Sequence, residues 1–497
     1  MTRSPRPRRT ASLLKSHFKH TIAVAIALLS LLCLAHAADV NPVPTIVGPP
    51  VPQAVQPASG QFTLKVYGAN FVQGALVNWN RQPRKTTFVS ARELHAAILA
   101  SDVANPTAGY ITVTNPPPGG GVSSSSYAIV EVHKPTNTII VGRPNLTWNY
   151  DYRLVFSDFN NDGVLDLENT WGTAIRVRPG NGDGTFGPNK TATYGYDNPA
   201  AIASGDFNND GNEDLIFGAN PNAPPNYLRT TLGNGDGTFR KGSRFGNLST
   251  YAFALAAGDF NRDGNLDVAS VTAPTNLDVF IGQGDGMFNH WAEYKEFTQS
   301  SPVNIVAADL NGDGILDLMV LADGVYSLLG RGDGTFEKPR NLIKNESAGC
   351  GTGSNNSLWV SDFNGDGIAD LAYCERDTNS GKIWVALGNG DGTFRKPVSL
   401  MVPANQGVFS FAVGDFNSDG KTDILTNYYL PKTFAKTETD LFLGNGNGTF
   451  QRKKIIRLPG QLEYNAENGI AANDLNSDGL LDLIIEQAGP LAIFVQR

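Results

Sequence analysis

The sequence predicts an all-β protein in which a β-sandwich precedes an array of repeated short strands. Two observations predict this class: an acidic loop pattern returns seven times, and a glycine-rich turn falls about halfway between successive copies. The composition agrees, because the 497 residues include 54 Gly and 29 Pro and only 17% are charged. Such a mixture is typical of turn-rich β proteins and argues against long helices or a charged disordered chain.

Residues 1–37 have the pattern of an export signal. The first twenty residues are basic and hold no acid, the apolar run TIAVAIALLSLLCLA follows, and Ala35-His36-Ala37 ends it as an A-x-A cleavage site. A retained membrane anchor is the alternative, but the run is shorter than a bilayer span. We therefore expect a secreted or cell-surface protein with no membrane insertion after cleavage.

Cleavage at Ala37 makes the chain more acidic. It removes six basic residues and leaves 33 Lys and Arg against 47 Asp and Glu, a net charge of −14. A surface of this sign does not suit nucleic acid or anionic lipid.

Residues 43–131 lie outside the repeats and read as a β-sandwich. The segments QFTLKVYG, ALVNWN, TTFVS and YITVTNP alternate apolar and polar residues between Pro-rich breaks. Gly68, Asn70, Phe71, Trp79 and the ending VTNPPPGGGVSSSSYAIV resemble an IPT/TIG immunoglobulin-like domain. Residues 132–136 are then a short linker.

From residue 137 to residue 497 the chain repeats with a period of about fifty residues. The acidic loops lie at 158–166, 206–214, 259–267, 309–317, 362–370, 415–423 and 474–482. The turn GNGDGTF or a close variant begins at 180, 233, 282, 330, 388 and 444. Each unit reads as four short strands, the first of them rich in small residues, which fits the blade of a β-propeller.

The predicted architecture is a seven-bladed β-propeller, with a linear β-solenoid as the alternative. The last unit stops before a seventh glycine-rich turn and lacks a fourth strand. The strand-like run NTIIVG at 137–142 is expected to pair with it, because closing the ring removes an exposed sheet edge.

Each acidic loop has oxygen-bearing residues at positions one, three, five and nine and Gly at position six. Oxygen ligands at alternating positions, with Gly where the chain turns, are typical of calcium loops. An EF-hand is excluded because position twelve carries no Glu and the flanks read as strands. The absence of His and Cys favours Ca²⁺ over zinc or copper. The alternative is that Asp, Asn and Gly only form tight turns.

The units resemble FG-GAP repeats of the bacterial VCBS type, which also form the blades of integrin α-subunits. The resemblance implies a calcium ion in the loop between the first and second strands of each blade, up to seven in all. The implied ligands are Asp158, Asn160, Asp162, Asp166, Asp206, Asn208, Asp210, Asp214, Asp259, Asn261, Asp263, Asp267, Asp309, Asn311, Asp313, Asp317, Asp362, Asn364, Asp366, Asp370, Asp415, Asn417, Asp419, Asp423, Asp474, Asn476, Asp478 and Asp482.

The loops expected on the propeller face opposite the calcium loops vary between repeats and contain many aromatic residues. These are Trp148, Tyr150, Tyr152, Trp171, Tyr194, Tyr196, Tyr227, Tyr251, Tyr428, Tyr429 and Tyr464. Aromatic side chains on loops of a rigid ring suit ligand contact, including stacking on sugars, and the alternative is that they pack between blades. Cys350 and Cys374 remain after cleavage and are candidates for a disulfide bond.

The sequence favours a calcium-binding interaction protein that binds an extracellular glycan or protein. No catalytic residues are predicted, because the three histidines left after cleavage (His95, His133 and His290) are scattered and no G-x-S-x-G pattern occurs. The alternative function is a calcium-dependent polysaccharide lyase or glycosidase, since a fold does not determine an activity.

Overall fold

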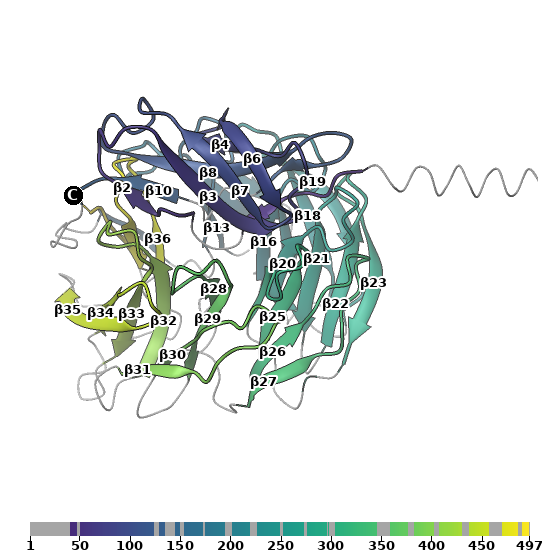
Figure 1. Cartoon of the computed structure of the whole chain (residues 1–497). Helices are drawn as coiled ribbons and strands as arrows, with labels where there is room; N and C mark the ends of the chain where they lie inside the picture. Colours follow the sequence, from purple (N-terminus) through teal and green to yellow (C-terminus); the bar gives the residue numbers. More distant parts are fainter. Residues whose placement is uncertain are drawn as a thin grey trace, which may run out of the picture.

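The computed structural model describes residues 40–46, 50–123, 129–134, 145–149, 154–171, 174–193, 201–218, 226–248, 252–272, 276–295, 297, 304–344, 358–375, 382–401, 407–429, 437–456, 470–485 and 490–496. Within these ranges the regular elements are all strands (Figure 1), which confirms the predicted all-β class. They contain no helix long and apolar enough to cross a membrane. The export signal lies outside the described residues.

The chain up to Val132 folds into two packed sheets, called the sandwich below. One sheet has the order β1-β3-β7-β6, and the other has β2-β10-β8-β4-β5 with β9 paired to β8. The bounds are Thr45–Ile46 (β1), Ala54–Val55 (β2), Phe62–Ala69 (β3), Leu76–Trp79 (β4), Gln82–Pro83 (β5), Lys85–Ser90 (β6), Glu93–Ile98 (β7), Thr107–Asn115 (β8), Gly121–Val122 (β9) and Ile129–Val132 (β10). Leu64, Val66 and Ile111 are fully buried between the sheets. The closer resemblance to an IPT/TIG domain stays a prediction.

Seven four-stranded sheets follow, called blades 1–7 below. Blade 1 comprises Leu154–Ser157 (β12), Asp166–Trp171 (β13), Ala174–Arg178 (β14) and Lys190–Thr193 (β15). Blade 2 comprises Ala201–Gly205 (β16), Asp214–Gly218 (β17), Leu228–Gly233 (β18) and Phe239–Phe245 (β19). Blade 3 comprises Ala252–Gly258 (β20), Asp267–Thr272 (β21), Asn276–Gly282 (β22) and Phe288–Tyr294 (β23). Blade 4 comprises Asn304–Ala308 (β24), Asp317–Leu321 (β25), Gly324–Leu328 (β26) and Arg340–Lys344 (β27). Blade 5 comprises Leu358–Ser361 (β28), Asp370–Glu375 (β29), Lys382–Ala386 (β30) and Val398–Met401 (β31). Blade 6 comprises Gly407–Gly414 (β32), Asp423–Tyr429 (β33), Thr437–Gly444 (β34) and Phe450–Ile456 (β35). Each is an antiparallel meander in chain order.

Blade 7 combines the two ends of the repeat region. Its strands Ile470–Asn473 (β36), Asp482–Ile485 (β37) and Pro490–Phe494 (β38) pair with Asn145–Asn149 (β11), which lies outermost. The pairing strand is thus 145–149 and not 137–142, which lies outside the described residues. In antiparallel register Asn145 faces Ile493 and Leu146 faces Ala492.

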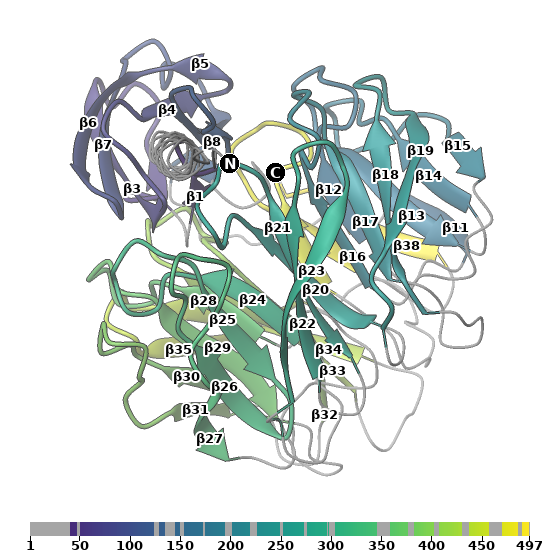
Figure 2. The ribbon, with the colours of Figure 1, turned by 90° about the vertical axis from the view of Figure 1, so that its right-hand side faces the viewer.

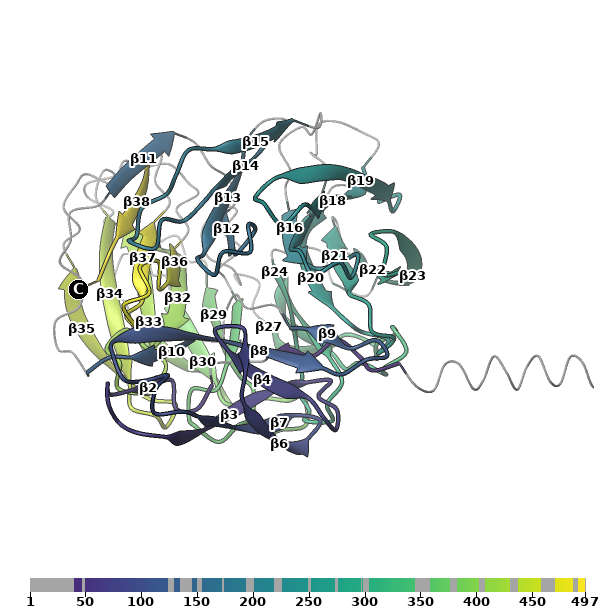
Figure 3. The same cartoon turned by 90° about the horizontal axis from the view of Figure 1, so that it is seen from above.

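Successive blades are joined by one recurring hydrogen bond. The last Gly of each glycine-rich turn donates its N–H to the carbonyl of position two in the preceding blade, as Gly286 does to Phe207 (3.0 Å). The same bond links blade 1 to blade 7, from Gly184 to Leu475 (3.3 Å). Figure 3 shows the blades succeeding one another around a centre, with β11 beside β38.

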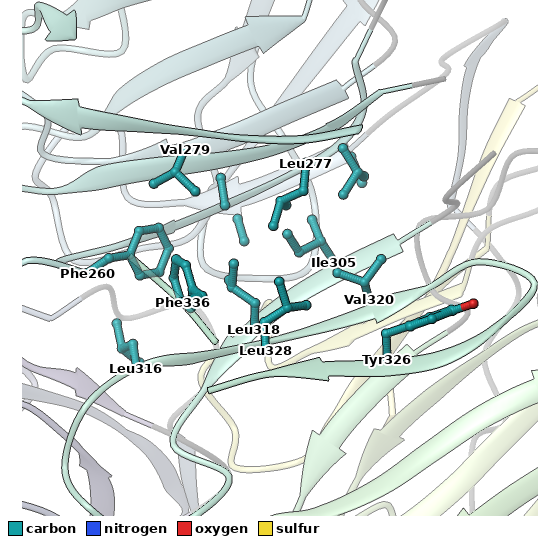
Figure 4. Packing of buried hydrophobic residues seen from close by; sticks show 14 of the residues in the cluster. Phe260, Leu277, Val279, Ile305, Leu316, Leu318, Val320, Tyr326, Leu328 and Phe336 are labelled. Carbon is teal, nitrogen blue, oxygen red and sulfur yellow. The ribbon is translucent and has the colours of Figure 1, made fainter. Parts of the chain in front are cut away.

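The core lies between neighbouring blades. Leu277 and Val279 of blade 3 pack against Ile305, Leu318 and other buried residues of blade 4, as Figure 4 shows. The first strands of the blades lie nearest the centre (Figure 3), and their small residues suit the limited space there.

Candidate functional site: seven acidic loops and the sandwich that contacts them

Every acidic loop folds its polar side chains back onto its own backbone. In loop 3, Asp259 Oδ1 accepts the N–H of Asp263 (3.0 Å) and Oδ2 accepts that of Gly264 (3.0 Å). In all seven loops the Asn at position three accepts the N–H of position five, and the Asp at position five accepts that of position seven. The loops therefore have a defined shape that their own side chains maintain.

Position four of the loop has a backbone conformation that was not predicted from the sequence. Its φ is positive in every loop, at Asn161, Asn209, Arg262, Gly312, Gly365, Ser418 and Ser477. A positive φ is unfavourable for most side chains and is relieved by Gly or Asn. The signal was present in the sequence, since two loops have Gly and two have Asn at this position.

The Asp at position nine connects the loop to the glycine-rich turn. In blade 2, Asp214 Oδ1 accepts the N–H of Gly233 (2.7 Å) and Oδ2 accepts the N–H of Phe207 (3.0 Å). Blades 3–7 repeat both bonds, with Gln496 in place of the glycine in blade 7, and Gly180 gives the Oδ1 bond in blade 1. All seven carboxyl groups are fully buried. Position nine thus has a structural role that we had not expected.

Burial dominates the electrostatics of position nine. The pKa of Asp214, Asp423 and Asp482 is raised to about 8 and that of Asp317 to about 7, mainly by burial and in addition by the carboxylates at positions one and five. The backbone N–H donors lower it, but by less. A compensating positive charge would therefore favour the ionised form of these groups.

The described residues contain no group of three or more His, Cys, Asp and Glu side chains that could hold a metal ion in this conformation. The Asn at position three contributes to this arrangement: its amide donates to the Asp at position five in loops 3, 4, 6 and 7. The donor chemistry still suits a hard cation, because each carboxylate oxygen has a second lone pair. In loop 1, buried Asp166 Oδ2 has no hydrogen-bond partner.

Two arginines of the sandwich reach the acidic loops. The Arg81 guanidinium pairs with Asp158 Oδ2 and donates to the carbonyl of Asn161 (3.1 Å) in loop 1. The Arg92 Nε lies 3.5 Å from Asp309 Oδ2 in loop 4. Both carboxylates occupy position one, so a cationic side chain stands beside two of the predicted metal loops.

Further hydrogen bonds extend the same interface to other acidic loops. The Val43 N–H donates to Asp259 in loop 3 (2.7 Å), and Gln53 donates to Thr422 in loop 6 (2.7 Å). Arg92 also donates to Gly367 of loop 5 (3.3 Å), and the Tyr110 hydroxyl donates to the Asp474 carbonyl of loop 7. Together with the contacts to loops 1 and 4, these hydrogen bonds connect the sandwich to six of the seven loops, and Figures 1 and 2 show the sandwich beside this face. Nothing in the sequence marked these residues.

The predicted aromatic face is described only in part. Tyr428 is fully buried in the core shared by blades 5 and 6, so the expectation that it contacts ligand was wrong. Tyr227 is half-buried, and the Arg244 guanidinium lies 4.3 Å from its ring centre. Trp148, Trp171 and Tyr429 lie in strands whose side chains are not described. Tyr150, Tyr152, Tyr194, Tyr196, Tyr251 and Tyr464 lie outside the described residues.

Cys374 is fully buried and forms a disulfide bond. Cys350, its predicted partner, lies outside the described residues.

The architecture and the loops define a class: an all-β protein of four-stranded repeats, each with an acidic loop between its first two strands. Two segments, residues 259–320 and 362–426, match the FG-GAP-like repeat family. Each segment begins at the acidic loop of one blade, blade 3 or blade 5, and ends within the second strand of the following blade. The chain therefore carries FG-GAP-like repeats, as its sequence predicted. No curated protein matches the chain.

Two solved structures resemble the chain at low sequence identity. One is a lectin of Agrocybe aegerita, studied for specific recognition of non-reducing terminal N-acetylglucosamine; it is 19% identical, with 69% of this chain and 87% of that chain covered and a TM-score of 0.43. The other is an auxiliary nutrient binding protein from Bacteroides ovatus, 13% identical, with 93% and 100% covered and a TM-score of 0.35. Likenesses of this strength do not bear on function.

Proposed function

We propose that this protein is an exported calcium-binding interaction protein that binds an extracellular glycan or protein ligand through the face opposite the acidic loops. One observation carries the choice of face: the sandwich contacts six of the seven acidic loops, so that side of the ring already has a partner within the chain. The loops on the face opposite the acidic loops are therefore the proposed site for an external ligand. The protein acts by binding and not by catalysis.

Calcium is the cation proposed for the acidic loops. The oxygens at positions one, three, five and nine would hold it, joined by the backbone carbonyl at position seven. The bound ion would neutralise carboxyl groups whose pKa burial raises, and it would tie the first and second strands of a blade together. Binding requires the position-three amides to turn away from position five. Metal that binds only the folded chain stabilises it by mass action.

Calcium binding is tested by thermal unfolding of the exported chain with calcium and with excess chelator. The melting temperature is expected to fall in chelator, and calorimetric titration of the chelator-treated protein is expected to show calcium uptake. An unchanged melt together with no heat of binding would contradict the assignment.

The ligand class is tested by incubating the labelled protein on arrays of glycans and extracellular proteins. The Tyr227→Ala variant and the triple variant Tyr194→Ala, Tyr196→Ala, Tyr251→Ala are expected to lose capture while keeping the wild-type melt. Glu337→Gln, an exposed charge change on blade 4, is the matched control. Turnover of a captured polysaccharide would contradict a binding role and favour the lyase or glycosidase alternative.

A further inference from the structure

A cavity of ≈ 660 Å³ lies between the sandwich and blades 1–3. Its sandwich wall includes Asn78 and Thr112, and its propeller wall includes Val155, Ile202 and Leu255 from the first strands of three blades. The volume is within the range of small-molecule sites, and such sites often lie between domains. This cavity is separate from the opposite face to which the proposed function assigns the external ligand.

The charged residues around the cavity favour a cationic ligand over an anionic one. Asp158, Asp206, Glu213 and Arg81 are its charged lining residues, and Arg81 is already paired with Asp158. Asp206 is satisfied by the N–H groups of its own loop. On the sandwich wall the Asn78 amide donates to Thr112 and Thr114, so these polar groups also have partners. Calcium bound in loops 1 and 2, as proposed above, would neutralise Asp158 and Asp206, so Glu213 is the remaining lining carboxylate.

Glu213 is the lining residue with an unmet hydrogen-bonding demand. It accepts a hydrogen bond from the Ser157 hydroxyl, and its buried Oε2 has no partner. No other described lining residue has a buried side-chain nitrogen or oxygen without a partner. The carboxylate turns readily about its last torsion, which can present Oε2 to a donor in the cavity.

Glu213 also departs from the packing rule of the repeat. It occupies position eight, where four other loops have Leu. Three of these leucines pack on a glycine of the preceding blade, with so little room that an added Cβ on Gly205, Gly258 or Gly414 would lie 2.4 to 2.7 Å from the leucine. At the equivalent contact between blades 1 and 2, Ser157 takes the place of the glycine and Glu213 takes the place of the leucine. A repeat that replaces apolar packing with an incompletely satisfied carboxylate loses stability, and such departures are expected at functional sites.

We propose that this cavity binds a small organic cation, with an aliphatic ammonium group held by Glu213 and the aliphatic body against Val155, Ile202 and Leu255. An ammonium group supplies the N–H donors that Oε2 lacks and compensates the negative charge of Glu213. The apolar first strands accommodate the carbon chain, which removes apolar surface from water.

The probe is the aliphatic diamine cadaverine, compared with the diol and the dicarboxylate of the same carbon chain. Calorimetric titration of the full exported chain is done with calcium present, so that the acidic loops do not compete for the amine. The diamine is expected to bind at least about tenfold more tightly than the diol, since a charged hydrogen bond exceeds a neutral one by roughly this factor. The dicarboxylate is expected not to bind.

Two variants locate the site. Glu213→Gln keeps the shape of the side chain and is expected to weaken diamine binding about tenfold or more. The double variant Ser157→Gly, Glu213→Leu copies the Gly205 and Leu266 pair of the next two blades, so it is expected to abolish binding without lowering the melting temperature. Glu337→Gln controls for the loss of one negative charge elsewhere.

Three results would overturn the proposal. The first is equal affinity for diamine and diol, which would indicate a site for neutral ligands. The second is wild-type diamine binding by a correctly folded double variant. The third is failure of the folded wild-type chain to bind the diamine. None of them depends on ligand capture by the opposite face, so the two proposals fail separately.

Discussion

At the scale of single residues, the buried Asp at position nine has a structural role besides its proposed role as a metal ligand. Asp267 accepts N–H groups from Phe260 within its own loop and from Gly282 at the end of the third strand. An added Cβ on Gly282 would lie 2.1 Å from the Leu266 carbonyl oxygen, so that close approach requires glycine. The hydrogen bonds that Asp263 at position five accepts come from residues of its own loop, Asn261 and Asn265. The two carboxylates are thus distinguishable by mutation.

Asp267→Asn is expected to lower the free energy of unfolding by about 1–3 kcal/mol even in chelator, because the amide cannot accept both N–H groups. Asp263→Asn is expected to change little in chelator and to reduce the stabilisation by calcium. Urea unfolding with calcium and with chelator measures both effects. If Asp267→Asn lowers the free energy of unfolding only when calcium is present, position nine acts only as a metal ligand.

At the scale of elements, the acidic loop and the glycine-rich turn of a blade form one unit. The carboxyl group at position nine receives its Oδ1 hydrogen bond from the first residue of the turn in blades 1–6. The last Gly of the turn then reaches position two of the preceding loop. Burial within this unit raises the pKa of several carboxyl groups, so the protonation of the loops is linked to the stability of the folded repeats.

This linkage predicts how the chelator-treated protein responds to pH. The pKa of Asp214 rises from 3.8 to about 8, so between these values the folded chain binds more protons than the unfolded chain. Stability in chelator is therefore expected to fall as pH rises from about 4 to about 8, as it does for any carboxyl group with a raised folded pKa. Calcium is expected to oppose this fall, because cation binding favours the ionised carboxylates. Thermal melts across this pH range check the sign, and a rise in chelator would contradict it.

At the scale of the whole molecule, hydrogen bonds between blades return from blade 7 to blade 1. In blade 7, Gln496 stands at the position that the first glycine of the turn has in the other blades: the Gln496 N–H donates to Asp482 (2.8 Å), and the side chain donates to the Phe416 carbonyl of blade 6 (3.2 Å). The outermost strand, β11, comes from the start of the repeat region. We propose that these contacts close a seven-bladed propeller on which the sandwich rests.

Removing residues 145–149 is expected to expose the edge of β38 and to promote association between chains, because an unpaired edge strand pairs readily. Size-exclusion chromatography measures the association. Gln496→Ala, which keeps all four strands, is expected to remain monomeric and to lose about 1 kcal/mol of stability with its side-chain bond to blade 6. A monomeric deletion variant as stable as the wild type would contradict the closure.

The double variant Arg81→Ala, Arg92→Ala is expected to strengthen calcium binding at two loops, because it frees Asp158 and Asp309 from cationic neighbours. The loss of stability is expected to be small, about 1 kcal/mol or less per pair, since both arginines are partly exposed. Calcium titration measures the affinity, and Arg395→Ala, an exposed residue of blade 5, is the control. An unchanged titration would show that the sandwich and the cation do not compete.

The sequence by itself determined the all-β class, the seven repeats and the four-stranded unit. These features are local: alternation, Gly-rich turns and the spacing of Asp and Asn act within a few residues of one another, so they are readable along the chain. The sequence also predicted that an upstream strand completes blade 7. The exact strand, 145–149 and not 137–142, depends on how β11 pairs with β38.

Only the tertiary structure decided which acidic positions are structural, where the sandwich lies and where the cavity forms. Asp214 meets Gly233 through the fold of a blade, Arg92 meets Asp309 across more than two hundred residues, and Glu213 meets Ser157 between two blades. Such contacts join residues that the sequence treats independently. Their geometry follows from the packing of whole sheets, which no local pattern encodes.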